Sequence, residues 1–340
     1  MDAGTVVVGA GSWGTTIASL LAAQGPTTLW ARSAELADVL TTTRENPRYL
    51  PGVTLPPMLR ITSSLSEAVF GADLVLVAVP SHGFRSVLEA MAGSVADSAA
   101  VVSLAKGIEA GTNLRMSEVI AEVLPGRHAG VLCGPNFALE VAAGQPAATV
   151  VALRDEALAK RVQERLHCGT FRVYTATDVV GCEIAGASKN VMAIAAGMSD
   201  GLGFGDNTRA LLVTRGLAEQ ARLGQALGAQ RVTFGGLAGI GDLVATCTSP
   251  QSRNRSVGMQ LAQGRKLSEI TSGMYMVAEG IRTARPLVAL ARAHGVELPI
   301  AEQVAALVAG ETAPKQAVAA LMDRPARSEW DEELTRAVER

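Results

Sequence analysis

Residues 6–14 read VVVGAGSWG, a run of valines that leads into three glycines in the spacing G-x-G-x-x-G. Apolar residues continue from Thr15 to Ala23 at helical spacing, so the glycines lie between an expected strand and an expected helix. In this context Gly9 makes the tight turn, Gly11 lets a pyrophosphate approach the backbone, and Gly14 allows the helix to pack closely on the strand. The stretch therefore predicts a dinucleotide site at the start of a helix, with a purely structural turn as the alternative.

The sequence that follows this motif predicts the fold class. Short β-type runs alternate with helical patterns through the first half of the chain, and the run 74–79 is apolar throughout, which is typical of a strand buried on both faces of a parallel sheet. Ser64 and Glu67 have the spacing of a capping box. This alternation predicts an α/β fold with an N-terminal Rossmann-like doubly wound domain over residues 1–177. The expected strands are 5–8, 27–30, 74–79, 100–104, 129–132 and 147–153; the expected helices are 15–23, 34–40, 65–70, 84–91 and 114–124.

The character of the sequence changes near residue 178. From there Ala, Leu, Met, Glu and Gly dominate, helical periodicities are long, and no run has a convincing strand pattern. We expect an all-helical substrate and catalytic domain over residues 178–325, which begins with a long apolar helix at 179–198. The residues after Asp323 are strongly charged, and we expect 326–340 to form a charged C-terminal tail.

Composition excludes several classes of protein. The 340 residues include 48% hydrophobic and 18% charged residues, enough apolar material for a large core. Thirty basic against 32 acidic residues argue against partners such as nucleic acid or an anionic membrane surface. The start of the chain has no pattern of a secretory signal, and we expect no membrane-spanning segment and a cytoplasmic protein. The four cysteines and four histidines are scattered without metal-ligand spacing, so no metal site is expected.

Two loops after expected strands carry basic side chains. Residues 29–33 read LWARS, with Arg32 where an NAD-selective fold places an acidic residue. Arg32 suits a 2′-phosphate, and the alternative is an exposed loop arginine. Lys106 closes the strand at 100–104 and could face a substrate, although spacing alone favours a surface lysine.

Residues 133–140, CGPNFALE, form a Gly-Pro turn with the amide of Asn136 at its tip.

Two segments of the second half combine polar side chains with apolar surroundings. Residues 183–191, EIAGASKNV, place Lys189 inside a helix of small apolar residues, where it must pair, reach solvent or face a cavity. A buried lysine of this kind can act in acid–base chemistry. Residues 239–255, GIGDLVATCTSPQSRNR, offer Asp242, hydroxyl groups and two arginines that could pair a lysine and hold a phosphate, or form only a polar loop between helices.

These motifs, taken in order, resemble the bacterial type of NAD(P)-dependent glycerol-3-phosphate dehydrogenase. The resemblance runs from about residue 5 to 310 and includes NPRYLPG at 46–52, Lys106-Gly107, GPNFA at 134–138, and the segments 183–191 and 248–255. It implies a Rossmann-like domain, a helical substrate domain, and reversible hydride transfer between the cofactor and C2 of dihydroxyacetone phosphate or sn-glycerol 3-phosphate. It also implies NADP and NAD as cofactors and a role in glycerophospholipid synthesis. We further expect a homodimer.

The resemblance assigns roles to individual residues. Lys189 matches the catalytic lysine, and Lys106 the lysine that contacts both substrate and cofactor. The implied catalytic set is Lys189, Asp242, Lys106 and Thr246; the substrate set is Lys106, Gly134, Asn136, Lys189, Asp242, Ser252, Arg253 and Asn254; the cofactor set is Gly9, Gly11, Ser12, Trp13, Gly14, Arg32, Tyr49, Lys106, Ala138, Arg253, Val277 and Glu279. Asn136 departs from the family, in which many members carry Ser or Thr at this position.

Chemistry of the residues agrees with this assignment. Hydride reduction of a ketone leaves negative charge on its oxygen, and Lys189 could donate the proton there. Asp242 would orient the lysine, while Lys106 and Arg253 would favour loss of its proton. Two alternatives remain: another NADP-dependent β-hydroxyacid or ketopantoate-like dehydrogenase, which would not need the phosphate segment, and a non-catalytic NAD(P)-sensing module, which would not need Lys189 or Asp242.

Overall fold

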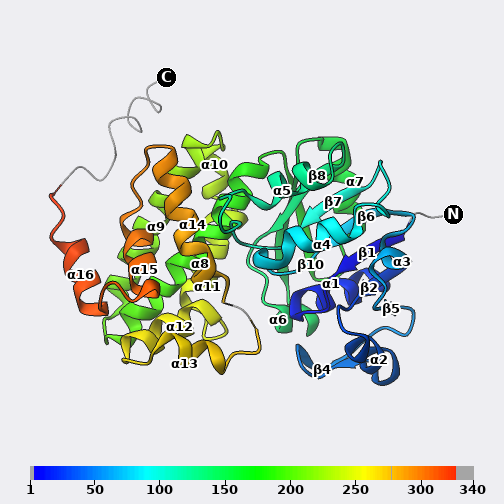
Figure 1. Cartoon of the computed structure of the whole chain (residues 1–340), viewed down its shortest axis with the longest axis horizontal. Coiled ribbons are helices and arrows are strands. Elements are labelled where there is room, and N and C mark those ends of the chain that lie inside the picture. Colours follow the sequence, from blue (N-terminus) through cyan, green and yellow to red (C-terminus); the bar gives the residue numbers. More distant parts are fainter. Residues whose placement is uncertain (1–3, 277, 327–340) are drawn as a thin grey trace.

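The structure, a computed structural model, describes residues 4–276 and 278–326, and it has a sheet-containing half followed by a helical half (Figure 1). The sheet half contains β1 (Gly4–Val8), α1 (Ser12–Ala22), β2 (Thr27–Trp30), α2 (Ala34–Thr43), β3 (Glu45–Asn46), β4 (Leu50–Thr54), β5 (Arg60–Thr62), α3 (Leu65–Val69), β6 (Ala72–Val77), η1 (Ser81–Gly83), α4 (Phe84–Met91), β7 (Ala100–Ser103), α5 (Met116–Val123), β8 (His128–Cys133), α6 (Ala138–Ala142), β9 (Ala147–Leu153), α7 (Glu156–Leu166) and β10 (Phe171–Ala176). The helical half contains α8 (Val179–Gly201), α9 (Asp206–Ala226), α10 (Arg231–Phe234), the π-helical η2 (Leu237–Gly241), α11 (Asp242–Thr248), α12 (Arg253–Ala262), α13 (Leu267–Ser272), α14 (Glu279–Ala293), α15 (Pro299–Ala309) and α16 (Pro314–Met322).

The main sheet has eight strands in the order β10-β9-β8-β7-β6-β1-β2-β5. The strands from β5 to β8 run parallel, whereas β9 pairs antiparallel with β8 and β10 follows β9 in parallel. The chain leaves β1 toward β2 and β5, then returns to the other side of β1 as β6. This reversal makes the carboxyl ends of β1 and β6 a topological switch point, where doubly wound sheets bind ligands.

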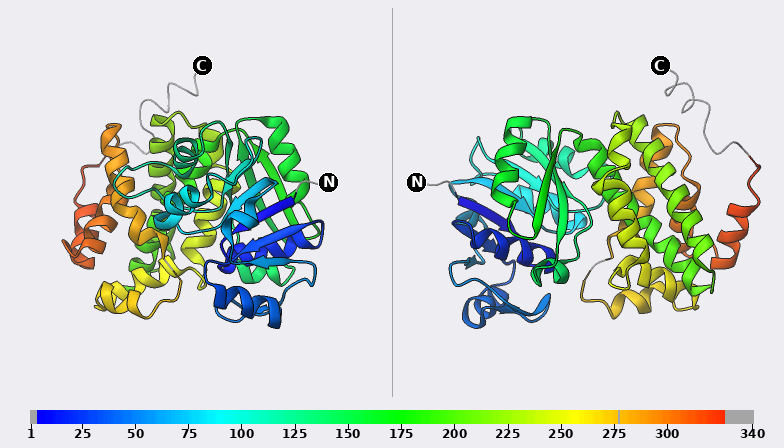
Figure 2. Two further views of the ribbon diagram at one scale, coloured as in Figure 1. Left: turned by 45° about the vertical axis from the view of Figure 1, so that its right-hand side comes forward. Right: turned by 180° about the vertical axis from the view of Figure 1, so that it is seen from behind.

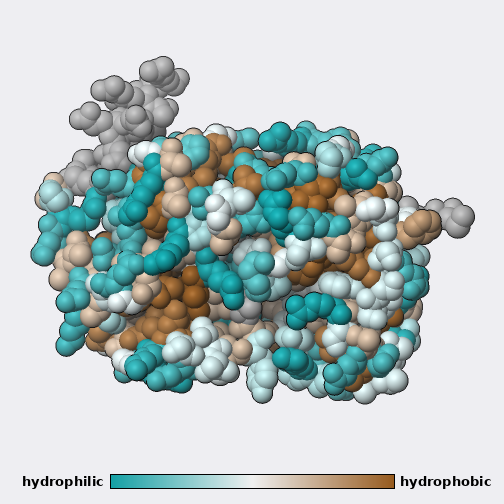
Figure 3. All heavy atoms as spheres, viewed as in Figure 1, coloured by the Kyte–Doolittle hydropathy of each residue, from teal (hydrophilic) through white to brown (hydrophobic). Residues whose placement is uncertain are grey.

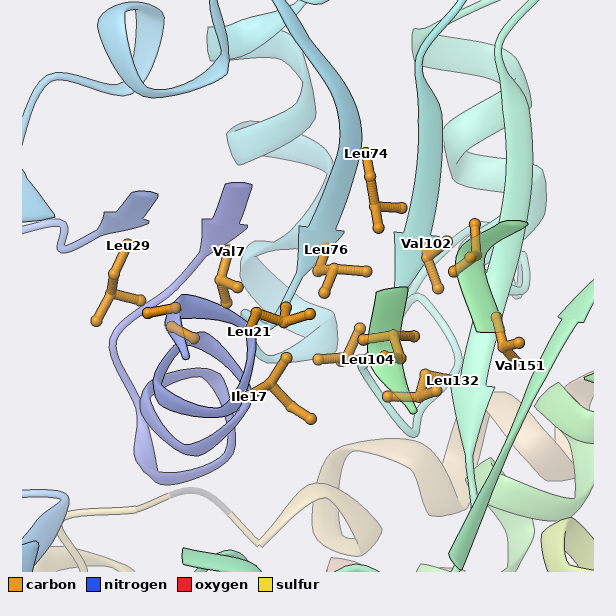
Figure 4. Packing of buried hydrophobic residues seen from close by; sticks show 14 of the residues in the cluster. Val7, Ile17, Leu21, Leu29, Leu74, Leu76, Val102, Leu104, Leu132 and Val151 are labelled. Atoms are coloured by element: carbon orange, nitrogen blue, oxygen red, sulfur yellow. The ribbon is translucent and has the colours of Figure 1, made fainter. Parts of the chain in front are cut away.

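Helices cover both faces of the sheet, so the central strands are buried on both sides. Val7 packs against Ile17 and Leu21 of α1 in one apolar cluster (Figure 4), while Val6 and Val8 belong to a second cluster with α3, α4 and α5. The predicted α/β class with a Rossmann-like N-terminal part and a helix-rich remainder is confirmed. Of the two views in Figure 2, the one from behind shows most plainly the helical half beside the sheet half.

All six expected strands are present, although their bounds shift by up to two residues. The expected strand at 74–79 is β6 at Ala72–Val77, and the expected helix at 15–23 begins already at Ser12. Strands β3, β4, β5 and β10 were not expected. Ser64 caps α3 as expected, but Glu67 forms an ion pair with Arg60. The expected tail at 326–340 lies almost entirely outside the described residues.

The long helix α8 forms the centre of the helical half, and α9, α11, α12, α14 and α15 all contact it. Among the described helices it alone is long and apolar enough to cross a membrane by length and composition, yet 94% of that apolar window is buried inside the protein. Such burial is typical of the core helix of a folded domain. Within residues 179–276 and 278–326 no strand is present, as the sequence predicted.

Helix α15 begins at a carboxylate from another helix. Glu219 of α9 is 3% exposed and accepts hydrogen bonds from the backbone N–H groups of Ile300 (2.7 Å) and Ala301 (3.2 Å). Burial raises the pKa of Glu219 to about 7, and the two N–H groups oppose this effect only in part. The carboxyl group is therefore protonated in the folded protein over a pH range in which the unfolded chain has lost the proton.

Replacement of Glu219 by glutamine is expected to remove a pH-dependent loss of stability. Between the ordinary pKa of 4.5 and the folded value of about 7, the folded state binds more protons than the unfolded state, so stability falls as pH rises through this window. The loss amounts to at most about 3 kcal/mol. Urea unfolding at pH 5, 6.5 and 8 should show a smaller decline for Glu219→Gln than for the wild type. The same change at the exposed Glu89 serves as control, and an equal decline in all three proteins would contradict the assignment.

Candidate active site

A buried cluster of two lysines, an aspartate and a threonine lies where the sheet meets the helical half. Asp242 is 2% exposed and binds Lys189 Nζ through Oδ1 (2.8 Å) and Lys106 Nζ through Oδ2 (2.6 Å). Lys189 Nζ also donates to Thr246 Oγ1 (2.7 Å), and Lys106 Nζ donates to the carbonyl oxygen of Gly134 (2.8 Å). All four predicted catalytic residues therefore meet, although they come from three segments far apart in the sequence.

Each ammonium group keeps donor capacity for a ligand. An ammonium has three N–H bonds, and two of them at each lysine are directed to the protein groups just named. Lys189 is 7% exposed, so a ligand oxygen bound there would replace little water. The cluster can therefore donate one hydrogen bond from each lysine to the same small molecule.

Electrostatics separate the roles of the two lysines. Burial is the largest influence on Lys189 and lowers its pKa; the Asp242 carboxylate opposes this, while the charge of Lys106 adds to it. At Lys106 burial also acts to lower the pKa, but Asp242 and then Cys133 outweigh it, so the pKa of Lys106 is raised. The expected influence of Lys106 on Lys189 is present, whereas Arg253 is not among the principal causes of the shift. Lys189 is thus the more readily deprotonated group.

The carboxylate between the lysines stays ionised. Burial alone would raise the pKa of Asp242, but the two ammonium groups outweigh it and hold the pKa below the ordinary value. Asp242 is the first residue of α11, and Thr246 lies one turn later on the same face. The hydroxyl group of Thr246 donates to the backbone oxygen of Asp242 (2.7 Å), which directs its lone pairs toward Lys189. Helix α11 therefore presents two acceptors to one ammonium.

A buried ion pair fixes the start of α8 against the sheet half. Glu183 accepts hydrogen bonds from Arg115 Nη1 (2.5 Å) and from the backbone N–H (2.7 Å) and hydroxyl (2.6 Å) of Ser117 at the start of α5. Lys189 lies six residues further along the same helix. The contact therefore sets the position of Lys189 relative to the sheet, and sequence reasoning did not identify it because nothing in the sequence pairs residue 183 with 115.

Asn190 is a further polar residue of the site that was not predicted. Its amide donates to the backbone oxygen of Lys106 (3.0 Å), and its Oδ1 accepts from Asn254 Nδ2 (2.9 Å). Asn254 Oδ1 in turn accepts from the backbone N–H of Gly280 (3.0 Å). This chain of amides connects the loop after β7 to α8, α12 and α14, and the signal in the sequence was a second buried polar residue directly after Lys189.

The predicted phosphate-binding residues stand at the start of α12. Ser252 is the N-cap and accepts from the backbone N–H of Arg255, while Arg253 is the first helical residue and is exposed. Among the described residues Arg253 forms no ion pair with a carboxylate. Its guanidinium is therefore available to an anionic ligand. The side chain of Asn254 is mostly engaged by Asn190 and Gly280, which leaves one N–H of its amide.

Direct backbone contact holds α12 against α8. A Cβ atom at Gly197 of α8 would overlap the carbonyl oxygen of Arg255, and one at Gly258 of α12 would overlap that of Ile194. The two helix axes can approach this closely only because both positions lack a side chain. The start of α12 is thereby held beside the middle of α8, where Lys189 lies.

The glycine turn after β1 has the geometry that the sequence predicted for it. Gly9 has φ +120°, and a Cβ atom there would lie 2.8 Å from the backbone oxygen of Ala78. A Cβ atom at Gly14 would overlap the oxygen of Gly9, so α1 packs directly on the turn. At Gly11 a Cβ atom would meet no atom within 4 Å, which leaves open space in front of the helix start. The turn therefore fits the approach of a pyrophosphate to backbone N–H groups.

The remaining predicted cofactor residues lie on several elements of both halves. Ser12 Oγ donates to the backbone oxygen of Tyr49 in the β3–β4 hairpin and also contacts Met276 Sδ (3.0 Å), and the ring of Trp13 packs edge-on against Phe171. Arg32 follows β2 and is exposed. Ala138 begins α6 and accepts from Thr16 Oγ1 (3.3 Å), and Glu279 begins α14. Val277 lies outside the described residues.

The Gly-Pro turn after β8 borders the lysine cluster. Gly134 has φ +153° and offers its carbonyl oxygen to Lys106. The amide nitrogen of Asn136 donates to the backbone oxygens of Pro135 (2.9 Å) and Ala148 (3.1 Å), so its Oδ1 is the atom left for a ligand. No group of three or more His, Cys, Asp or Glu among the described residues could hold a metal ion.

Two family models match the chain. The model described as "NAD-dependent glycerol-3-phosphate dehydrogenase N-terminus" matches residues 5–159, and the model described as "NAD-dependent glycerol-3-phosphate dehydrogenase C-terminus" matches residues 178–319. Together they cover most of the chain, and the second begins at the first residues of α8.

Individual relatives agree with the family models. Glycerol-3-phosphate dehydrogenase [NAD(P)+] 2 of Sphingopyxis alaskensis is 53% identical over 298 residues, which are 88% of this chain and 90% of the relative. Glycerol-3-phosphate dehydrogenase [NAD(P)+] of Thermobifida fusca is 50% identical over 327 residues, 95% of this chain and 97% of the relative. The crystal structure of glycerol-3-phosphate dehydrogenase from Coxiella burnetii is 37% identical with a TM-score of 0.91 and covers 95% of this chain and 99% of its own.

Proposed function

Because the chain belongs to the NAD-dependent glycerol-3-phosphate dehydrogenase family, it is an NAD(P)-dependent oxidoreductase that interconverts dihydroxyacetone phosphate and sn-glycerol 3-phosphate, and we propose which of its residues carry the reaction. One observation carries this proposal: Asp242 holds both the buried Lys189 and the half-buried Lys106, each with an N–H left for a ligand. The relatives do not favour the two alternatives, a ketopantoate-like dehydrogenase and a non-catalytic sensor.

The cofactor site lies at the turn after β1. The open space at Gly11 and the close contact of Gly14 with Gly9 fit a dinucleotide pyrophosphate there. The residues that would hold NAD or NADP are Gly9, Gly11, Ser12, Trp13, Gly14, Arg32, Tyr49, Lys106, Ala138, Arg253, Val277 and Glu279. The bound nicotinamide would supply or accept the hydride at C2.

Lys189 acts as the acid and base of the reaction. In reduction it donates a proton to the oxygen on C2, where negative charge develops, and in oxidation its neutral form takes the proton back. The lowered pKa of Lys189 brings both forms closer to neutral pH. Lys106 stays charged and stabilises the developing oxyanion, while Asp242 and Thr246 hold the lysines in place.

Arg253 binds the phosphate of the substrate, together with Ser252 and Asn254 at the start of α12. The N-terminal end of α12 adds backbone N–H groups that favour an anion. Because the phosphate is remote from C2, its binding energy can orient the reacting carbon between Lys189 and the cofactor. Gly134 and Asn136 border the other side of the substrate.

Substitution of Arg253 by alanine is expected to raise KM for dihydroxyacetone phosphate by roughly 10- to 100-fold, because a charge-assisted bond to phosphate contributes about 1.5–3 kcal/mol. The rate with unphosphorylated dihydroxyacetone should change little. The ratio of kcat/KM for the phosphorylated substrate to that for the unphosphorylated substrate therefore decreases. Steady-state loss of NADPH absorbance with both substrates measures this. An unchanged preference would contradict the assignment of Arg253, and equal wild-type rates with both substrates would contradict the proposed phosphate site as a whole.

We also propose that the chain divides at about residue 177 into a cofactor domain and a substrate domain and acts as a homodimer in the cytoplasm, in support of glycerophospholipid synthesis. Apolar patches on the surface in Figure 3 support an association surface, and Phe204, Leu211 and Val232 of the helical half are 40%, 49% and 77% exposed. Light scattering of the purified protein gives its molar mass in solution. The mass of a monomer at micromolar protein concentration would contradict the proposed homodimer.

A further inference from the structure

Three basic side chains come from segments of both halves, and His82 is close enough to the other two, Arg32 and Arg282, to feel their charges. Arg32 follows β2, His82 lies in η1 after β6, and Arg282 belongs to the first turns of α14 in the helical half. All three side chains are exposed. Only Arg32 was predicted to contact a cofactor, and neither His82 nor Arg282 has a role in the reaction described above.

A hydrogen-bonded contact between the halves brings these side chains together. The carboxylate of Glu279 accepts from Ser81 Oγ (2.5 Å) and from the backbone N–H of Ser81 (3.3 Å), which fastens the first turn of α14 to the loop after β6. His82 is the next residue after Ser81. Arg282 lies three residues after Glu279 and therefore on the same face of α14, toward that loop.

Charge effects agree with this placement. Partial burial is the largest cause that lowers the pKa of His82, followed by the positive charges of Arg282 and then Arg32. The charges of both arginines, one from each half of the molecule, therefore act on His82. Arg32 lies at the end of β2 and His82 follows β6, and these two strands flank β1, which leads into the glycine turn.

Glu279 is the one nearby carboxylate among the described residues that acts on Arg282, and its charge is shared with Arg253. Neither Arg32 nor Arg282 forms an ion pair with any described residue, and the carboxylate of Glu279 is already bound to Ser81. Two guanidinium groups that approach one imidazole repel each other, and an anion bound between them removes this repulsion. A phosphomonoester dianion has the charge and the acceptor oxygens for two guanidinium groups.

We propose that Arg282 and His82 complete, with Arg32, a site for the 2′-phosphate of NADP, so that a residue of the helical half determines cofactor specificity. The inference rests on the proposed cofactor site at the turn after β1. Arg32 binds the phosphate from the sheet half, Arg282 binds it from α14, and His82 donates from the loop between them. The 2′-phosphate of NADP therefore adds a link between the two halves that NAD lacks.

Direct binding of adenosine fragments tests this proposal without turnover. The probes are adenosine 2′,5′-bisphosphate and adenosine 5′-monophosphate, which differ only in the 2′-phosphate, and titration calorimetry gives Kd for each. Arg282→Gln is expected to raise Kd for adenosine 2′,5′-bisphosphate by roughly fivefold to tenfold. Its Kd for adenosine 5′-monophosphate should stay within about twofold of the wild-type value. Arg282→Lys should retain most of the preference. Arg292→Gln, in the last turn of the same helix, is the matched control and should bind as the wild type does.

The outcomes separate this inference from the proposed function. If Arg282→Gln binds adenosine 2′,5′-bisphosphate with wild-type affinity, Arg282 does not bind the phosphate. If the variant loses affinity equally for both probes, Arg282 only supports the loop, and the proposal is overturned as well. Arg32→Asp provides the reference for loss of the 2′-phosphate contact. A wild-type protein that binds NADPH and NADH but shows no preference for the bisphosphate would overturn the phosphate site alone, whereas failure to bind either dinucleotide would contradict the proposed cofactor site itself.

Discussion

Replacement of Lys189 by alanine is expected to lower kcat for the reduction of dihydroxyacetone phosphate by several hundred-fold or more. A positioned acid contributes about 10²–10⁴ in rate, and Lys189 Nζ is held by Asp242 (2.8 Å) and Thr246 (2.7 Å) with one N–H free for the reacting oxygen. The Kd for NADPH should change little, because the lysine acts on charge that develops only during the reaction. Steady-state kinetics and fluorescence titration of NADPH measure the two quantities.

Controls distinguish loss of chemistry from loss of structure. Lys160→Ala removes an exposed lysine of α7 that pairs with Glu156 and should leave kcat unchanged. Circular dichroism and the unfolding temperature report whether Lys189→Ala still folds. A decrease in kcat of less than about tenfold in a folded variant would show that Lys189 is not the proton donor.

Replacement of Asp242 by asparagine is expected to damage both stability and turnover. The change leaves the ammonium groups of Lys106 and Lys189 without their shared carboxylate, and removal of one partner from a buried ion pair costs about 3–5 kcal/mol. The Asp242 charge also raises the pKa of Lys189, so its loss lowers that pKa further. Fewer Lys189 side chains then carry a proton at neutral pH, and reduction slows by roughly a hundredfold.

The direction of the pH effect identifies the cause. In Asp242→Asn the pH at which the rate of reduction declines should move to lower values, because the donor loses its proton earlier. Asp200 is a matched control, since it is also a buried carboxylate that pairs with two cations, Arg209 and Arg255, away from the lysines. Asp200→Asn should lose stability with the pH profile unchanged. An unshifted profile in Asp242→Asn would mean that Asp242 does not control the protonation of Lys189.

Much of the sheet could be predicted because its strands are buried runs. The apolar run at Ala72–Val77 and the valines before Gly9 identify strands through composition alone. The edge strands were missed for a physical reason: β5 has only three residues, and β10 reads FRVYTA, where buried Phe171 and Val173 alternate with exposed residues as on a strand with one solvated face. The reversed direction of β9 depends on a connection that holds only the five-residue α6, too short for a regular crossover.

Sequence reasoning singled out candidate site residues whose side chains are costly to bury, and it missed their partners. Lys189 and Asp242 stood out because a charged side chain among apolar residues requires a partner or a ligand. Asn190, Glu183 and Ser81 gain their significance from contacts with residues 64 to 198 positions away, and no local pattern contains that information. Family resemblance named the residues that would touch the ligands, while the structure adds those that hold them.

The crossing of α8 and α12 has a consequence for which molecules can react. Backbone contact at Gly197 and Gly258 leaves no side chain whose rearrangement could change the separation of the two helices. One helix carries Lys189, the proposed proton donor, and the other carries Arg253, the proposed phosphate ligand. The separation of the two helix backbones is therefore fixed, and under the proposed roles it limits substrates by length: the carbonyl must lie within a narrow range of distances from the phosphate.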